Sequence, residues 1–283
     1  MGRLMHHGMP KGESKMSNPV RNISAIAKRE ILSFFVSPVA YFVIAGFAVL
    51  SGYFFFSLLG AFNLVVRQYN MMPYHPPGST VPNLNQWVVE GYYHTLIVVL
   101  VFLIPLLTMR LIADERKNGT FELLITSPLS VGEIIMGKYL GVASVILIMA
   151  SLSFIFPVLL TFYADQGLGG PEFLPILSGI GGLVLCALAF ASIGMAVSAF
   201  TENQVVAAIC SMVTLLLLYV LGSAAEAMSG GLWPEVFRYL SPVLQVQDLI
   251  KGVVTLQSLV YFGTLITLGV FLSKRALEAY RWR

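Results

Sequence analysis

A polar stretch at 110–133 interrupts two long apolar segments and holds the side chains best suited to chemistry with a partner. Its distinctive residues are Arg110, Asp114, Glu115, Arg116, Lys117, Gly119, Thr120, Glu122, Leu123 and Pro128. Carboxylates and guanidinium groups form charge-assisted hydrogen bonds and ion pairs. We therefore expect this stretch to present charge to another molecule from a protein otherwise made for lipid.

The sequence lacks the motifs that would give this stretch, or any other, a chemistry of its own. It has no Gly-x-x-x-x-Gly-Lys-Ser/Thr phosphate loop, no Gly-x-Ser-x-Gly elbow and no His-Glu-x-x-His zinc helix. His75 and His94 have no second ligand at metal-binding spacing. We expect no catalytic residue, no metal and no cofactor bound by this chain, so that energy must come from another subunit.

Composition indicates which solvent organises the fold. Charged residues make up 11% of the 283-residue chain, hydrophobic residues make up 57%, and the mean hydropathy is +0.81. A soluble domain of this length would carry more charge on its surface. We predict an all-α polytopic membrane protein with about six transmembrane helices, since backbone groups facing lipid must bond within a helix. The predicted spans are 36–59, 88–109, 134–162, 173–200, 205–225 and 253–272.

The distribution of Lys and Arg predicts the orientation. Basic residues gather before the first predicted span, between the second and third, and after the sixth, whereas the other side holds only Arg67, Arg238 and Lys251. The positive-inside rule then places both termini and the polar stretch in the cytoplasm. We expect a multi-pass protein of the bacterial inner membrane, with residues 1–17 as a disordered or non-native extension.

Residues 18–35 have the pattern of an amphipathic helix. Val20, Ile23, Ala27, Ile31 and Phe34 recur at helical spacing. The polar side chains on its other faces include Arg21, Lys28, Arg29 and Glu30. This pattern predicts a helix lying in the cytoplasmic interface of the membrane. The alternative is a simple basic flank of the first span.

Two connections on the opposite side differ in character. The connection at 61–86 is rich in Pro and Gly and is expected to be a loop. The stretch at 226–252 mixes apolar and helix-breaking residues over a length too short to span twice. Short helices dipping into the outer leaflet and an ordinary interfacial loop are both consistent with it.

The polar stretch also carries a family resemblance. The run from Asp114 to Lys138 resembles the signature of type-two exporter permeases of the ABC transporter superfamily, with its Glu-Arg, Gly-Thr, Glu-x-Leu, Pro and Gly-Lys series. Glu30 with Ser37-Pro38, and Lys251-Gly252 near the end, look like the gliding-motility-associated permease subunit. The resemblance extends from about residue 18 to the end of the chain.

This resemblance implies a role for the stretch and a set of partners. Glu115, Arg116, Gly119, Thr120, Glu122, Leu123 and Pro128 would form a coupling segment that docks on a separate ATP-binding cassette subunit, which holds ATP and Mg. A second permease copy or a related permease would complete a dimer, with substrate passing along the seam. Apart from the resemblance, we expect the second and fifth spans to line this path, including Thr214 and Tyr219. An extracytoplasmic accessory protein would be a further partner besides the lipid bilayer, and no nucleic acid is expected.

The expected function is therefore that of a permease subunit that couples ATP hydrolysis on its partner to export. One alternative is a non-transporting scaffold or mechanical component that uses the same coupling. Another is a membrane-embedded enzyme, which would need acid and base groups to converge at one depth. The carboxylates Glu90, Asp165, Glu172 and Glu226 are instead scattered among connections. At the level of the segment, the alternative is a solvated loop whose basic residues only fix topology.

Overall fold

The structure is a computed structural model of the 283-residue chain that describes residues 19–74, 81–117, 119, 129–163, 172–228 and 231–281. These residues form helices and contain no strand, and six helical segments among them are long and apolar enough to cross a membrane. The predicted all-α class with about six transmembrane helices is thereby confirmed.

The helices have the following bounds. The helices that belong to the six apolar segments are α2 (Pro38–Met71), α3 (Gly91–Thr108), α6 (Val131–Tyr163), α7 (Phe173–Phe200), α8 (Gln204–Ala227) and α11 (Leu256–Arg281). The other segments are α1 (Pro19–Val36), η1 (Asn85–Glu90), α4 (Ala113–Lys117), α9 (Leu232–Leu240) and α10 (Pro242–Ile250). The segment η1 is a wide π-helical turn that leads directly into α3.

The first and last long helices run further than their predicted spans. Helix α2 continues to Met71, through residues expected to belong to a loop, because 61–71 contains neither Pro nor Gly and the first breaker is Pro73. Phe62, in this extension, is buried in the same apolar core as Leu84 and Val88. At 1.5 Å per residue the 34 residues of α2 reach about 51 Å, well beyond a hydrocarbon core of about 30 Å.

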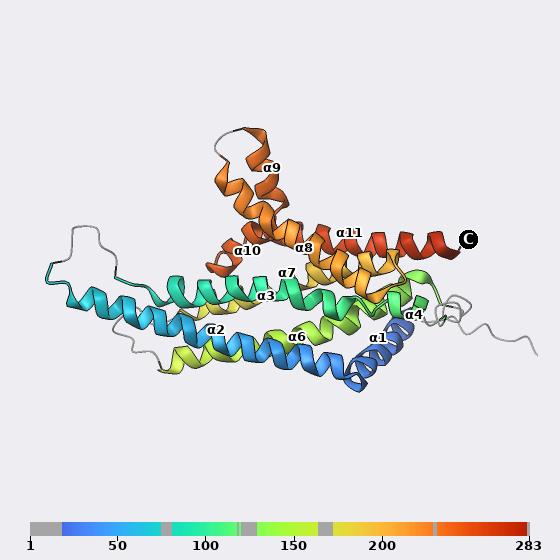
Figure 1. The fold of residues 1–283 in the computed structure, drawn as a ribbon, viewed down its shortest axis with the longest axis horizontal. Coiled ribbons are helices and arrows are strands. Elements are labelled where there is room, and N and C mark those ends of the chain that lie inside the picture. Colours follow the sequence, from blue (N-terminus) through green and yellow to red (C-terminus); the bar gives the residue numbers. More distant parts are fainter. Residues whose placement is uncertain are drawn as a thin grey trace, which may run out of the picture.

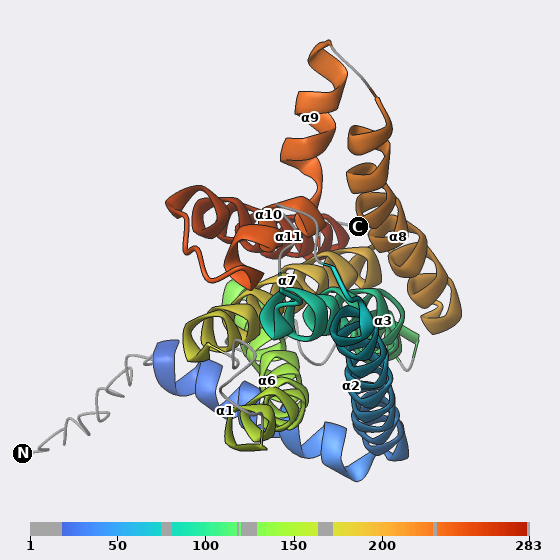
Figure 2. The same cartoon turned by 90° about the vertical axis from the view of Figure 1, so that its left-hand side faces the viewer.

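Helices α3 and α7 form the centre of the bundle (Figures 1 and 2). In their most apolar windows 67% of the residues are buried, against 22% for α2 and α8. Helix α3 contacts α2, α7 and α8, and α7 contacts α3, α6, α8, α10 and α11. The second predicted span is therefore largely enclosed within one chain, and α2 and α8 expose apolar faces to their surroundings.

Glycines and buried hydroxyl groups bring these helices together. A Cβ on Gly269 of α11 would lie 2.6 Å from the Ser192 hydroxyl of α7, so only a glycine permits this approach. Between α2, α3 and α6, the Tyr92 hydroxyl donates to the Ser153 carbonyl at 3.0 Å and pairs with the Ser51 hydroxyl. Packing and interhelical hydrogen bonds hold helices in lipid, where burial of apolar surface gains little.

Different short helices lie toward the two ends of the bundle. Helices α1 and α4 and the end of α11 share one of them, hereafter the α4 end (Figure 1). Further toward the other end, α9 projects away from the body beside α8, and α10 packs against α7 (Figure 2). The stretch at 226–252 thus contains two short helices. Val246 and Leu249 of α10 approach Gly182, about 14 Å along α7 from its start at Phe173.

Candidate functional site

Helix α4 is a short helix held at its start by a residue from α7. Ser198 Oγ accepts the backbone N–H of Ala113 at 3.1 Å and that of Ile112 at 3.4 Å, and it donates to the Met109 carbonyl at 3.1 Å. The first N–H groups of a helix have no partner within the helix. A fully buried serine therefore fixes where α4 begins and in which direction it leaves α3.

The polar side chains of α4 reach the neighbouring turn between α7 and α8. Arg116 donates to the Ala199 carbonyl at 2.7 Å and lies 3.9 Å from the Glu202 carboxylate. Asp114 accepts a hydrogen bond from the Gln204 side chain, at the first residue of α8. A displacement of α4 must therefore move the end of α7 and the start of α8, or break these contacts.

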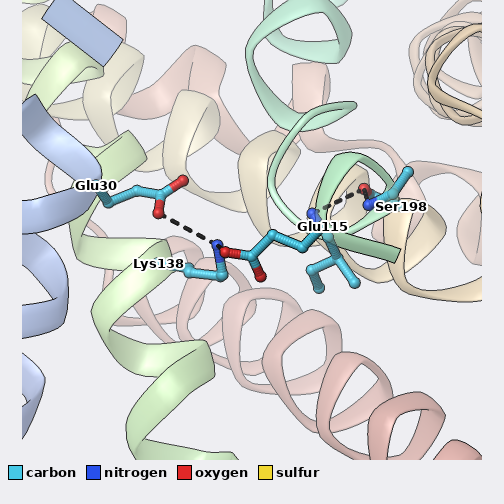
Figure 3. A network of polar contacts seen from close by, with 6 residues as sticks. Glu30, Glu115, Lys138 and Ser198 are labelled. Atoms are coloured by element: carbon cyan, nitrogen blue, oxygen red, sulfur yellow. Dashed lines mark hydrogen bonds and ion pairs between the residues drawn. The ribbon is translucent and has the colours of Figure 1, made fainter. Parts of the chain in front are cut away.

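On its other side α4 joins a buried charge cluster, formed by Glu30, Lys138 and Glu115 (Figure 3). The Lys138 ammonium, on α6, lies 2.8 Å from the Glu115 carboxylate and 3.2 Å from that of Glu30 on α1. The Lys138 side chain is only 3% exposed, and the two carboxylates are 16% and 18% exposed. One cation thus bridges α1, α4 and α6 in a place where an unpaired charge would be costly.

A further contact ties Arg110, three residues before α4, to the start of α2. Arg110 donates to the Ser37 hydroxyl, which also accepts the Val39 N–H at the first turn of α2. A cavity of about 80 Å³ lies at this junction and is lined by residues of α1, α4 and α6, among them Arg29, Glu30 and Lys138. The surroundings of α4 thus include the starts of α2 and α8, the end of α7, the first turns of α6, and α1.

Helix α1 packs on α6 rather than presenting all of its apolar face to lipid. A Cβ on Gly137 would lie 2.6 Å from Ile26, and a Cβ on Gly141 would lie 2.7 Å from Glu30. Ala27 and Phe34 are buried, and the α1–α6 contact gains a hydrogen bond from Asn22 to Glu133 at 3.3 Å. Part of the apolar face predicted for this helix, Ala27 and Phe34, is therefore buried within the protein, whereas Val20 stays exposed.

The residues expected at this end separate into four groups. Glu115, Arg116 and Glu30 lie together in the contacts described above, whereas Arg21, Lys28 and Arg29 are exposed on α1. Gly119 is exposed and has a φ of 69°, a left-handed conformation that favours glycine. Thr120, Glu122, Leu123 and Pro128 lie outside the described residues.

The structure also locates the residues predicted on the translocation path and shows contacts of residues that the sequence did not single out. Thr214 and Tyr219 lie half-buried on α8, away from the α4 end, and the described residues hold no group of three ligands able to bind a metal. Sequence reasoning missed the roles of Lys138, Ser198 and Gln204. Lys138 was visible as a charge close to an apolar run, but Ser198 and Gln204 carry no signal that would connect them to a segment more than 80 residues earlier.

Comparison with known families identifies this architecture. A search of curated proteins finds no match. The profile of the family described as "ABC-2 family transporter protein" matches residues 25–272, which include α4, its contacts and all helices except the start of α1 and the end of α11. Since this match covers most of the chain, the protein belongs to the ABC-2 family of transporter proteins.

Proposed function

We propose that this chain is the permease subunit of an ABC exporter, driven at its α4 end by a separate ATP-binding subunit. Membership of the ABC-2 family supports a membrane-spanning component of an ABC transporter. The proposal adds the direction of transport, the place where force enters and the helices that receive it. The single observation that carries it is the set of contacts around α4, centred on the bridge from Glu115 through Lys138 to Glu30.

The α4 end is assigned to the cytoplasm. Arg21, Lys28 and Arg29 of α1 are exposed there, as is Lys117 of α4. The excess of basic residues on this side of the spans favours the cytoplasmic side of the membrane. The membrane is proposed to be the bacterial inner membrane. An ATP-binding subunit would then meet a surface that includes Lys117 and Gly119, both exposed beside the buried contacts of α4.

Force applied to α4 has defined routes into the membrane domain. Arg116 and Asp114 connect it to α7 and α8, and Glu115 connects it through Lys138 to α6 and α1. Packed helices shift between discrete arrangements rather than deforming continuously. A small rotation of α4 on nucleotide binding would therefore be converted into a rearrangement of several helices at once.

ATP and Mg are assigned to the partner subunit. The chain has no Gly-x-x-x-x-Gly-Lys-Ser/Thr motif, so it would not bind the nucleotide phosphates by that route. In this proposal the chain receives and distributes movement, and the hydrolytic chemistry occurs on its partner.

A second permease chain, identical or related, is part of the proposal. The apolar faces of α2 and α8 are exposed, with Phe42 81% and Leu217 60% accessible, and are available to lipid or to such a chain. Thr214 and Tyr219 lie on α8 and would be near a path between two subunits. Within the family, we propose the gliding-motility-associated subfamily. Glu30, which belongs to the charge cluster, and the Ser37-Pro38 junction support this assignment.

Affinity purification from native membranes in mild detergent tests the proposal. The full chain is expected to recover an ATP-binding cassette protein with ATPase activity. Lys117→Glu should reduce this recovery, because it reverses the charge of an exposed residue on α4. Lys274→Glu, a matched exchange on α11 at the same end, should retain it. Recovery of the correctly inserted chain without any ATP-binding protein would contradict the proposal, and reconstituted transport would separate export from a purely mechanical role.

A further inference from the structure

A polar cavity of about 360 Å³ lies among α8, α9, α10 and the start of α11. Helices α9 and α10 lie away from α4 (Figure 1). Its lining includes Glu226 at the end of α8, Glu235 and Arg238 of α9, and Gln245 and Asp248 of α10. A second recess, of about 330 Å³, shares Gln247 with it and is lined by residues of η1, α3 and α10. The contacts of α4 described above include none of these residues, so the cavity is separate from the proposed coupling site.

The cavity is rich in negative charge and in hydrogen-bond acceptors. Three carboxylates, those of Glu226, Glu235 and Asp248, outnumber the single guanidinium of Arg238. The five ion pairs found within the described ranges include none of these four side chains. An ionised carboxylate only accepts hydrogen bonds. The four charged side chains are exposed, and a ligand that complements the carboxylates would supply hydrogen-bond donors and positive charge.

Gln245 provides an independent indication of a ligand. The residue is 8% exposed and lines the cavity, and its side-chain amide makes no hydrogen bond to another residue of the described part of the chain. Its backbone carbonyl, by contrast, accepts the Ser258 hydroxyl at 2.8 Å. Most polar side chains of residues this enclosed have a hydrogen-bond partner. An amide so placed is suited to bonding a group that enters the cavity.

A hydrogen bond and a close helix approach hold parts of the cavity wall. Tyr261 donates to the Leu240 carbonyl at 2.8 Å, where α9 ends and α10 is about to begin. A Cβ on Gly222 of α8 would lie 2.8 Å from the Ser241 hydroxyl, so α8 and α10 approach closely. Preformed sites bind with a smaller loss of conformational entropy than sites that must be ordered.

We propose that this cavity is a binding site for a cationic amine or guanidinium group. The carboxylates accept its N–H donors, Gln245 supplies the amide oxygen, and the exposed ring of Tyr239 offers a face for cation–π contact. A cavity lined by one sign of charge beside low-dielectric walls concentrates ions of the opposite sign. The ammonium group could belong to a small amine or to a basic side chain of an extracytoplasmic protein.

Equilibrium binding to the full chain in phosphatidylcholine nanodiscs, without any ATPase subunit, tests this site. Radiolabelled spermidine probes for a small amine, and a fluorescent tetralysine peptide probes for a basic protein segment. Saturable binding that weakens with salt is expected for at least one probe. Binding of spermidine would identify the small-amine source, and binding of the peptide alone would identify the protein source.

Substitutions locate the binding. Glu226→Gln and Asp248→Asn should each weaken it about tenfold, as expected for loss of a charge-assisted hydrogen bond. Gln245→Leu should also weaken it, whereas Glu202→Gln, an equivalent exchange at the α4 end, should bind as the unmodified protein does. Unchanged thermal unfolding of each variant shows that the fold is retained. Absence of saturable binding of both probes up to about 1 mM, or unchanged affinity in the cavity variants, would overturn the proposal.

Discussion

Lys138→Met should separate the two roles of the charge cluster, stability and transmission of movement. The substitution keeps the length of the side chain but removes the cation shared by Glu30 and Glu115, at 3.2 and 2.8 Å. Removing one partner of a buried ion pair costs about 3–5 kcal/mol, because the other charge stays buried without compensation. Since the carboxylates keep 16% and 18% of their exposure, we expect the lower end, about 3 kcal/mol.

The assay for stability is thermal unfolding of the full chain in detergent. At about 2–4 °C per kcal/mol, the melting temperature of Lys138→Met should fall by about 6–12 °C. The triple variant Lys138→Met, Glu30→Gln, Glu115→Gln should recover at least half of this loss, since no buried charge is left unpaired. Lys274→Met is the control, because its pair with Glu278 is exposed and worth about 0.3–0.5 kcal/mol.

The assay for transmission is the distance between spin labels at Ala25 on α1 and Lys117 on α4, both exposed. A narrow distribution is expected in the unmodified protein, because Lys138 bridges the two helices. The triple variant should show a broader distribution even though its stability is largely restored. An unchanged melting temperature in Lys138→Met, together with equal distance widths in all variants, would refute the reasoning.

Three further predictions concern single contacts. Gly137→Ala should loosen α1 from α6 and speed proteolysis of α1, at a cost of about 1–3 kcal/mol, because the new Cβ would meet Ile26 at 2.6 Å. Gly132→Ala is the control, since nothing lies within 4 Å of its Cβ, and equal proteolysis of the two variants would contradict the packing of α1 on α6. Ser198→Ala should cost about 1–2 kcal/mol and raise hydrogen exchange at the start of α4; unchanged exchange there would show that Ser198 does not cap it. Tyr92→Phe should lower stability by about 1–2 kcal/mol, because a buried hydroxyl that links three helices is lost. Thermal unfolding measures this, and a variant as stable as the unmodified protein would argue against the hydrogen bonds to Ser51 and Ser153.

The sequence predicts the fold class well because the bilayer imposes strong local rules. Span length and apolar composition are readable without knowing which helices touch, and α7 occupies the residues expected for the fourth span. The predicted loop begins too early, at the end of α2, because the Pro and Gly residues near 73–78 indicate a loop for the whole connection. Residues 61–71 contain neither Pro nor Gly and continue the helix. The contact of α1 with α6 is not readable from the sequence, because a helix-binding face and a lipid-binding face have similar side chains.

The candidate site was only partly predictable for a related reason. Glu115 and Arg116 stand out as charges in an apolar chain, so they could be found from the sequence. Their partners could not: Lys138 meets Glu30 across 108 positions, and Ser198 meets Ala113 across 85. The cavity near Gln245 combines residues of four separate helices, and the burial of Gln245 is evident only in three dimensions.

Photo-crosslinking from α4 in native membranes tests the central claim most directly. A benzophenone side chain in place of Lys117, which is exposed on α4, should form an adduct with an ATP-binding cassette protein. The same group in place of Trp233, exposed on α9, should form none with that protein. An adduct from Trp233 instead of Lys117 would contradict the proposed docking of the ATPase subunit at the α4 end.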